Sequence, residues 1–475
     1  MNSPFALVIF GATGDLAYNK LLPALFTLFK QKQLPEDFFI FGFARRDLAL
    51  SQFAGLFDQF TQDKEWKNFT KHLYYQRGLF DEKKGYEALV KKLEDLDTAM
   101  GACITRIFYL ATPPQNYDVI LDNLYSAKLS EGCGQGSKQW TRIAIEKPFG
   151  KDLKTAKALD KKLSDIFEER QIFRVDHYLG KETVQNMLVF RFANGIFDPT
   201  WNNEYIDNVQ ITLAEKKGIT NRGKFFDGVG ELMDMGQSHL MQLIAGVAMD
   251  MPLNFSKEGV RDARAKALAT IKIIQPQDVE KYVVRGQYEG YTSEKDVDPH
   301  SQTETFVAMK FFVDTPRFSG VPFYVRSGKN MSENVIEISL VFKQTCHILF
   351  KEIGCPEEGN ILKIRIQPNE GISIQIIAKV PGPALQLGTA NMHFSYAEEY
   401  GTSGIDAYEK ILMDIFTGDQ MLFNRSDELE SSWLFIEKIL KGWENSHAKA
   451  YLYKSGSWGP AQATTLIEKD GRKWV

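Results

Sequence analysis

The chain contains 475 residues, which is too long for a single hydrophobic core, so we expect two domains. Its apolar content of 44% and charged content of 25% are those of an ordinary globular protein. The formal net charge of −4 argues against a dedicated nucleic-acid binder and against a polybasic membrane surface, so we expect neither partner.

The four cysteines, Cys103, Cys133, Cys346 and Cys355, form no C-x-x-C pair. Their spacing predicts neither a disulfide framework nor a zinc site. The N-terminal apolar run is too short for a signal peptide, and no window approaches the ~18 consecutive apolar residues of a membrane span. We therefore expect a cytoplasmic protein without a metal.

The first predicted element is a buried parallel strand, because residues 5–10 form an unbroken apolar run. A glycine turn follows at once, before a helix expected over 16–30. Glycines let the backbone approach a phosphate, and the helix N-terminus offers free N–H groups. The spacing is G-x-x-G-D rather than G-x-G-x-x-G, so a structural turn without a ligand stays an alternative. The candidate loop residues are Gly11, Thr13, Gly14, Asp15 and Leu16.

Two adjacent arginines, Arg45 and Arg46, follow a second apolar strand expected over 38–43. At this point an NAD enzyme usually carries an acidic residue for the ribose 2′-hydroxyl, whereas arginine can accept a 2′-phosphate. The pair therefore favours NADP as the cofactor, although it does not exclude NAD. A solvated basic pair without a ligand is the alternative.

Strands and helices then alternate as in an α/β protein, up to a boundary expected near residue 178. Pro148 keeps Lys147 out of helical geometry, which suits a strand-end residue that points at a ligand. The first domain, 1–178, is thus predicted to be a Rossmann-like, doubly wound α/β domain. Its further expected elements are strands at 73–76, 104–110 and 142–145, helices at 84–96, 117–125 and 153–168, and a loop at 132–136.

A mixed polar cluster, Arg174-Val-Asp-His-Tyr-Leu-Gly-Lys181, follows the short apolar lead-in of Ile172 and Phe173. It is expected where a strand meets a helix, which is the edge at which open α/β sheets bind ligands. His177 and Lys181 suit an anion, and Asp176 can hold and polarise a histidine from elsewhere in the chain.

The second domain, 179–475, changes character, because several segments alternate with period two. We expect a larger α+β domain with a mainly antiparallel sheet and helices on one face. An uncovered sheet face is often buried in a homodimer or homotetramer. The expected strands are at 209–213, 336–342, 361–366, 372–378 and within 303–313, and the expected helices at 229–247, 257–271, 407–416 and 427–441.

Three polar patches of this domain are unremarkable when taken singly. The first, Glu231 to His239, lies at the head of an otherwise apolar helix, where a histidine is usually a core residue. Arg326 to Lys329 and Arg365 to Glu370 each end a predicted strand, where charged residues are normally just solvated. Sequence pattern alone assigns these patches no chemistry.

Taken together and in order, the glycine turn, Glu146–Gly150, the cluster at 174–181 and these three patches resemble the glucose-6-phosphate dehydrogenase family. The resemblance covers nearly the whole chain, and R-V-D-H-Y-L-G-K is its most specific motif. It implies oxidation of D-glucose 6-phosphate at C1 to 6-phospho-D-glucono-1,5-lactone, with hydride transfer to NADP⁺, as the first step of the oxidative pentose phosphate pathway.

The resemblance also implies residue roles. His239 matches the general base for the C1 hydroxyl, and Asp176 matches the group that orients it. The residues matching holders of the sugar phosphate are His177, Tyr178 and Lys181, and those matching the sugar pocket are Glu215, Asp234, Lys329 and Gln367. Lys20 and Lys147 match lysines near the substrate and nicotinamide, and the cofactor matches are Gly11, Thr13, Gly14, Asp15, Leu16, Arg45 and Tyr109.

Three positions depart from the usual family pattern. Ser238 stands where the family has Asn, so we expect one local hydrogen bond to differ. Asn334 stands where a second basic residue is common, so we expect one sugar contact to differ from the family pattern. Arg46 replaces Ser or Gln, which strengthens the expected preference for a 2′-phosphate.

Two rival functions remain open at this stage. One is a dehydrogenase of an unphosphorylated pyranose or an inositol, against which His177 and Lys181 argue. The other is a catalytically silent NADP-binding sensor or scaffold, against which the retention of both Asp176 and His239 argues.

Overall fold

The computed structural model describes residues 3–132, 141–401, 404–446 and 448–475. They divide into two compact units, each discontinuous in sequence. The first unit extends to Gly180 and also contains Ser256–Arg261 and Ile405–Leu429. The boundary predicted near residue 178 did not include these two returning segments. Apart from Gly132, the loop expected at 132–136 lies outside the described residues.

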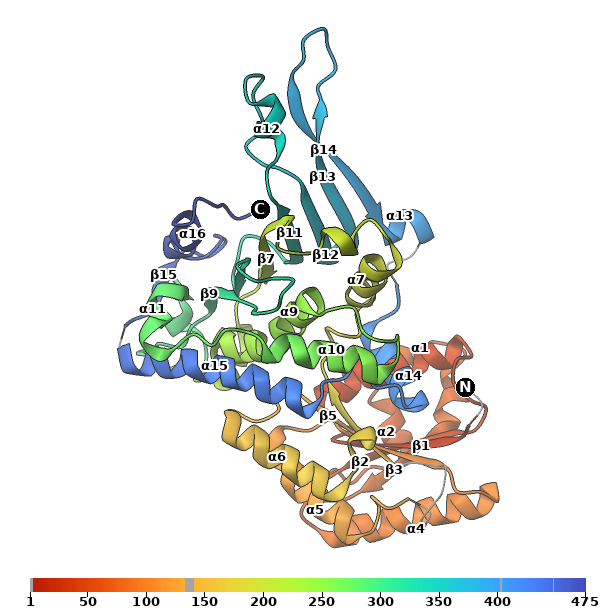
Figure 1. Ribbon diagram of the computed structural model, residues 1–475. Helices are drawn as coiled ribbons and strands as arrows, with labels where there is room; N and C mark the ends of the chain where they lie inside the picture. Colours follow the sequence, from red (N-terminus) through yellow and green to blue (C-terminus); the bar gives the residue numbers. More distant parts are fainter. Residues whose placement is uncertain (1–2, 133–140, 402–403, 447) are drawn as a thin grey trace. The chain divides into compact units, whose positions relative to one another are not determined.

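The first unit is built on six parallel strands in the order β3-β2-β1-β4-β5-β6 (Figure 1). This is the Rossmann-like, doubly wound arrangement that the sequence predicts. The strands are β1 (Phe5–Phe10), β2 (Phe38–Ala44), β3 (Leu73–Arg77), β4 (Thr105–Leu110), β5 (Arg142–Glu146) and β6 (Ile172–Val175). The helices are α1 (Leu22–Lys30), α2 (Leu50–Gly55), α3 (Trp66–Phe69), α4 (Lys83–Met100), α5 (Tyr117–Ser126), α6 (Leu153–Ile166) and α14 (Ala407–Thr417).

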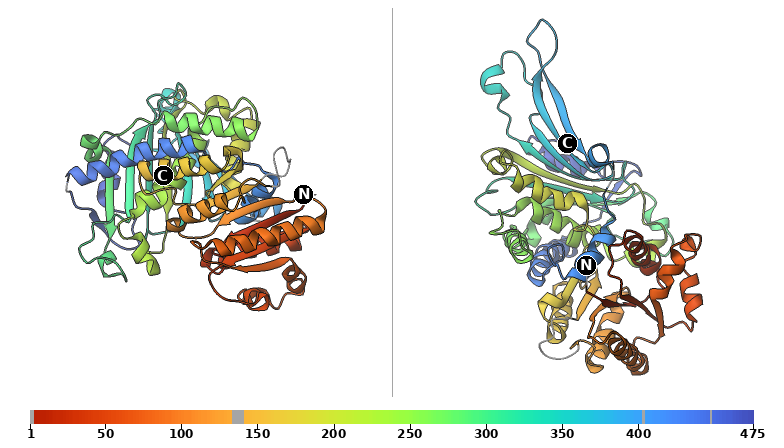
Figure 2. Two further views of the ribbon diagram at one scale, coloured as in Figure 1. Left: turned by 90° about the horizontal axis from the view of Figure 1, so that it is seen from below. Right: turned by 90° about the vertical axis from the view of Figure 1, so that its right-hand side faces the viewer.

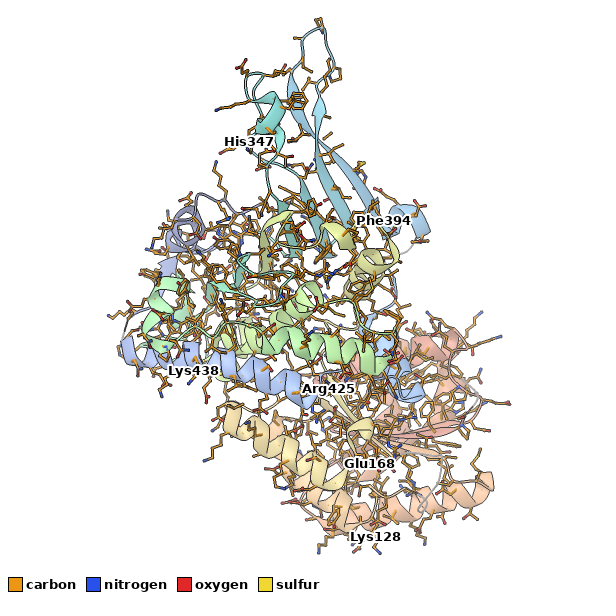
Figure 3. All side chains as sticks on the ribbon, in the orientation of Figure 1. Lys128, Glu168, His347, Phe394, Arg425 and Lys438 are labelled. Carbon is orange, nitrogen blue, oxygen red and sulfur yellow. A yellow bond between two sulfur atoms is a disulfide. The ribbon has the colours of Figure 1, made fainter. Side chains whose placement is uncertain are left out.

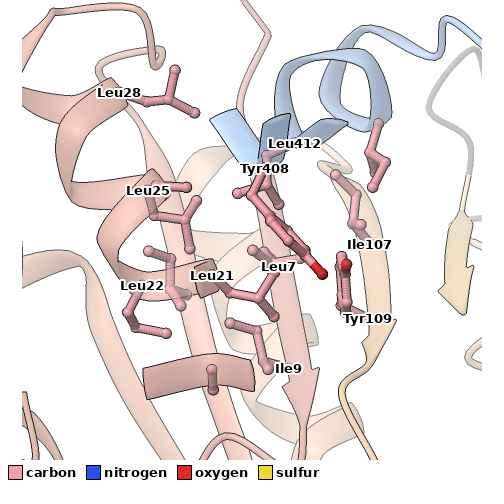
Figure 4. Packing of buried hydrophobic residues seen from close by; sticks show 14 of the residues in the cluster. Leu7, Ile9, Leu21, Leu22, Leu25, Leu28, Ile107, Tyr109, Tyr408 and Leu412 are labelled. Carbon is pink, nitrogen blue, oxygen red and sulfur yellow. The ribbon is translucent and has the colours of Figure 1, made fainter. Parts of the chain in front are cut away.

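Alternate residues of β1 pack into two apolar clusters, one on each face of the sheet. Leu7 and Ile9 pack with α1 and α14 (Figure 4). Ala6, Val8 and Phe10 pack with α4, α5 and α6. Because helices cover both faces, every residue of β1 is buried, which explains its unbroken apolar run.

The second unit contains a nine-stranded sheet in the order β14-β13-β12-β11-β7-β10-β9-β8-β15. Its pairing is antiparallel except between β7 and β10 and between β8 and β15, so the predicted mainly antiparallel sheet is confirmed. The strands are β7 (Ile206–Ala214), β8 (Val283–Tyr288), β9 (Phe306–Phe312), β10 (Pro322–Gly328), β11 (Val335–Phe342), β12 (Ile361–Gln367), β13 (Gly371–Lys379), β14 (Leu387–Ser395) and β15 (Tyr451–Tyr453).

The helices of the second unit cover its sheet unevenly. Leu466 of α16 packs with Phe306, whereas Phe311 packs with Phe435 of α15, so the sheet carries helices on both faces rather than on the one face expected. The helices are α7 (Glu182–Ala193), α8 (Gly223–Phe226), α9 (Met241–Ala248), α11 (Val279–Tyr282), α12 (Cys346–Phe350), α13 (Tyr396–Tyr400) and α16 (Ala461–Glu468), while α10 (Lys257–Ala269) and α15 (Ser426–Ser446) begin in the first unit.

One end of this sheet is a long hairpin of β13 and β14, which extends beyond the neighbouring strands (Figure 2, right). Beside it, α12 carries His347 (Figure 3). Cys346 and Cys355 are joined by a disulfide, with their Cα atoms 5.9 Å apart. The expectation that no disulfide is present was therefore wrong. The pairing depends on how this loop folds back, which the cysteine spacing alone does not reveal.

No helix among the described residues has both the length and the apolar character needed to cross a membrane.

Candidate active site

The glycine turn after β1 is held tightly against the neighbouring strands. The Gly11 N–H donates to Phe43 O at 2.9 Å, and the Gly14 N–H donates to Gly11 O at 2.9 Å. Gly11 has φ +83°, and a Cβ there would lie 2.5 Å from Ala111 O, so only glycine fits. The turn lies where strand order reverses, between β2 and β4, which is the usual dinucleotide position. Its backbone therefore fits a bound pyrophosphate.

The predicted loop residues lie around this turn. Gly14, Asp15 and Lys20 are exposed, and Thr13 and Leu16 are half-buried. The helix begins as a π-helical segment, Ala17–Leu21, before α1. The sequence predicted one regular helix here, and π-helical turns are rare and frequently occur at functional sites.

Arg45 and Arg46 directly follow β2, and both are exposed. The Arg46 carbonyl accepts a hydrogen bond from the Tyr75 hydroxyl at 2.7 Å, so the backbone is fixed at this point. No ion pair joins either guanidinium to another described residue. Two exposed guanidinium groups at the edge that carries the glycine turn have the chemistry needed for a 2′-phosphate.

Glu146, a half-buried residue, ends β5 and was not predicted as a site residue. The hydroxyls of Tyr109 and Tyr408 donate to its Oε1 at 2.6 and 3.3 Å, and that of Tyr117 donates to its backbone carbonyl at 2.9 Å. Burial raises the pKa of Glu146 to about 7, although both phenols oppose the shift. The carboxyl group of Glu146 thus changes its protonation state near neutral pH.

Tyr408 is the second residue that sequence analysis missed. It lies on α14, and its hydroxyl points toward that of Tyr109 (Figure 4). Its ring stacks on His177, with centroids 6.1 Å apart and planes 15° apart, and the Lys20 ammonium lies 6.0 Å from its centroid. Nothing local in the sequence indicates that this tyrosine packs beside residues more than 200 positions earlier.

The predicted cluster after β6 lies at the same edge of the sheet. Asp176 is 1% exposed, and its Oδ1 accepts from the Tyr178 N–H at 3.0 Å. Tyr178 is buried and His177 half-buried. After β5, Lys147 is half-buried and precedes a cis peptide bond to Pro148. Because all six strands are parallel, the first unit brings its predicted cofactor and polar residues to one edge.

Three of the four predicted sugar-pocket residues, Glu215, Asp234 and Lys329, lie together at the end of β10. The Lys329 Nζ lies 2.7 Å from Glu215 Oε2 and 3.7 Å from Asp234 Oδ2. Glu215 follows β7, which runs parallel to β10, so both side chains emerge at one end of the sheet. The carboxylates of Glu231, Glu215 and Asp234 raise the pKa of Lys329 above its ordinary value, against the opposing effect of burial.

Lys181 and Gln367 form a second pair in this unit. The Lys181 ammonium donates to Gln367 Oε1, and the Thr183 hydroxyl donates to the Ile366 carbonyl at 3.3 Å. The N-terminus of α7 is thereby tied to the end of β12. These two predicted residues, far apart in sequence, are neighbours in the structure.

His239 and Asp234 both lie on a buried nine-residue π-helical segment, Leu232–Leu240. The sequence predicted an ordinary helix over 229–247. Among the departures from the family pattern, Ser238 is buried on this segment, and Asn334 Oδ1 accepts from the Lys216 N–H at 2.7 Å. Asn334 thus binds the backbone at the position where the family commonly has a second basic residue.

The parallel sheet with its glycine turn defines a dinucleotide-binding domain, and the second unit adds a cluster of paired charges around Lys329. A model described as the NAD-binding domain of glucose-6-phosphate dehydrogenase matches residues 8–186, and one described as its C-terminal domain matches residues 188–475.

Known proteins of this family are similar to the chain along nearly its full length. The glucose-6-phosphate 1-dehydrogenases of Chlamydia pneumoniae and Aggregatibacter actinomycetemcomitans are each 42% identical, over 99% and 98% of this chain and 96% of theirs. A solved glucose-6-phosphate dehydrogenase in complex with its substrate glucose-6-phosphate superposes with a TM-score of 0.91 at 32% identity, covering 100% of this chain and 99% of that one. The chain therefore belongs to the glucose-6-phosphate dehydrogenase family.

Because the pKa of Glu146 is raised, the free energy of unfolding should depend on pH. The Glu146→Gln substitution should weaken this pH dependence. A glutamate of the unfolded chain has a pKa of about 4.3, and the folded value is about 7. The protonated form is thus favoured on folding, so this contribution to stability is present below about pH 4 and is lost as the pH rises through 7. The amide keeps an oxygen for Tyr109 and cannot ionise.

The free energy of unfolding, from urea denaturation, should therefore fall less between pH 4.5 and pH 8 in Glu146→Gln than in the wild type. Glu94→Gln, at an exposed position of α4, should retain the wild-type pH dependence. Identical pH dependence in all three proteins would contradict the prediction.

Proposed function

We propose that the chain oxidises D-glucose 6-phosphate at C1 to 6-phospho-D-glucono-1,5-lactone, with NADP⁺ as hydride acceptor, in the oxidative pentose phosphate pathway. The observation that carries this proposal is the full-length match to glucose-6-phosphate 1-dehydrogenases. The solved relative bound to glucose-6-phosphate supports the same substrate. The bound cofactor would supply the acceptor for the C1 hydride.

In this proposal His239 takes the proton of the C1 hydroxyl. A neutral imidazole has the proton affinity that such a base needs near pH 7. Asp176 would orient this ring, fix its tautomer and stabilise the charged form after proton transfer. The carboxylate suits that role because it is enclosed and its Oδ1 is already fixed by the Tyr178 N–H.

The remaining residues bind and orient the two ligands. His177, Tyr178 and Lys181 would hold the sugar phosphate, and a lysine ammonium beside a phosphate forms a strong charge-assisted hydrogen bond. The sugar hydroxyls would be bound by Glu215, Asp234, Lys329 and Gln367, with Lys20 and Lys147 near the reacting carbon. The cofactor would be bound by Gly11, Thr13, Gly14, Asp15, Leu16, Arg45, Arg46, Tyr109 and Lys147.

A homodimer or homotetramer is also proposed. The β13–β14 hairpin supports it, because most of the side chains of these two strands are half-buried or exposed, and apolar Met392 on β14 is 53% exposed. Such long exposed strands are usually covered in a stable assembly. The proposed location is the cytoplasm, because phosphorylated sugars and NADP are metabolites of that compartment.

Steady-state kinetics of the purified chain test the proposed reaction. NADP⁺ reduction should be fast with glucose 6-phosphate and at least 100-fold less efficient, in kcat/KM, with free glucose or an inositol, because these lack the phosphate. Equal efficiency with free glucose would favour the pyranose or inositol dehydrogenase. Nucleotide binding without turnover of any of these substrates would favour the silent sensor.

The cofactor preference should depend on the arginine pair. An Arg45→Ala, Arg46→Ala double variant should raise KM for NADP⁺ by roughly 10- to 100-fold, because each charge-assisted hydrogen bond contributes about 1.5–3 kcal/mol. KM for NAD⁺ should stay within about threefold. Arg77→Ala, an exposed arginine at the end of neighbouring β3, is the matched control and should change neither constant. A double variant that keeps a strong NADP⁺ preference would refute the assignment.

A further inference from the structure

The ammonium of Lys329 is surrounded by three carboxylates that differ in exposure. Besides Glu215 and Asp234, Glu231 Oε2 lies 3.4 Å from Nζ. The Glu215 side chain is 38% exposed, whereas that of Glu231 is fully buried. Glu215 can therefore reach a ligand from solvent, but Glu231 can act only through the groups that enclose it.

Glu231 is fixed in place by its surroundings. The Ser327 hydroxyl donates to its Oε1, and its own N–H donates to the Glu304 carbonyl at 3.0 Å. Ser327 lies two residues before Lys329 on β10, so a single strand end carries both the group that anchors Glu231 and the ammonium that Glu231 faces. A fully buried carboxylate is costly unless it is paired, and Lys329 supplies that pair.

We propose that Glu231 is a positioning residue for sugar binding, which holds the Lys329 ammonium from the enclosed side while the more exposed Glu215 faces the sugar hydroxyls. The inference rests on the proposed function of this pocket. It adds a residue that touches no ligand and that neither motif nor spacing indicated. Its charge, rather than its volume, is the property that matters.

Protonation should switch this effect. Burial raises the pKa of Glu231 to about 7, against the opposing effect of Lys329. Below that pH the carboxyl is neutral and attracts the ammonium less, so the wild type should come to resemble a Glu231→Gln variant. The titratable groups that face Glu231 are Lys329 after β10, Glu215 after β7, Asp234 on the π-helical segment, Glu304 before β9 and Tyr453 on β15.

The test is binding of glucose 6-phosphate to the full chain without cofactor, measured by isothermal titration calorimetry between pH 5.5 and pH 8. At pH 8, Glu231→Gln should raise Kd about tenfold, the size expected for losing one charge-assisted interaction. The ratio of the two Kd values should fall toward one at pH 5.5. In turnover, KM for the sugar phosphate should rise while kcat stays within about threefold. Glu231→Asp, which restores the charge, should recover part of the affinity.

Glu304→Gln is the matched control. Glu304 is also buried, and burial raises its pKa to about 7 as well, but its Oε1 accepts from the Leu232 N–H at 3.1 Å and it forms no ion pair with Lys329. Its Kd at pH 8 should stay within twofold of the wild type. A Glu231→Gln protein with wild-type Kd at pH 8, or with a Kd ratio that does not vary with pH, would overturn the inference. A wild type that does not bind glucose 6-phosphate would instead refute the proposed function.

Discussion

The first unit depends on one constraint, which is that all six of its strands run parallel. Side chains that follow β1, β2, β5 and β6 must then emerge at the same edge of the sheet. The glycine turn, the arginine pair, Glu146 with Lys147, and Asp176 with His177 are consequently collected there without being close in sequence. Helices on both faces bury the strands, so this edge is where polar groups can meet a ligand.

Buried or half-buried ionisable groups in both units have defined partners. In the first unit Glu146 accepts hydrogen bonds from two phenols, and in the second Lys329 lies among three carboxylates. Such groups are costly to enclose unless they are paired, and two of them, Glu146 and Glu231, have pKa values raised to about 7. Both clusters therefore combine rigid placement with sensitivity to pH near neutrality, a combination typical of functional sites.

The sequence predicted the first unit well because its signals are local. Buried parallel strands appear as continuous apolar runs, and β1 was placed to the residue. The π-helical segments were missed, because periodicity does not distinguish them from ordinary helices. In the second unit β14 was missed because both of its faces are partly exposed, and β15 because it has only three residues.

The parts of the site that were missed depend on long-range packing. Tyr408 belongs to α14, which packs in the first unit more than 200 residues after β6, and no property of its neighbours in sequence indicates that position. Glu231 appeared to be an ordinary charged residue at the head of an apolar helix. The structure shows that the Glu231 side chain is enclosed, because the ends of β7 and β10 lie beside it. The roles proposed for His239 and Lys329 come from the family resemblance, because spacing alone assigned none.

A double-mutant cycle on kcat tests most directly the proposal that Asp176 and His239 act as one catalytic unit. Asp176→Asn and His239→Asn should each lower kcat, the latter by about 10²- to 10⁴-fold. The double variant should be little slower than the His239→Asn protein, because the aspartate acts through the histidine. Losses that multiply fully in the double variant, or a His239→Asn protein with near wild-type kcat, would contradict the account.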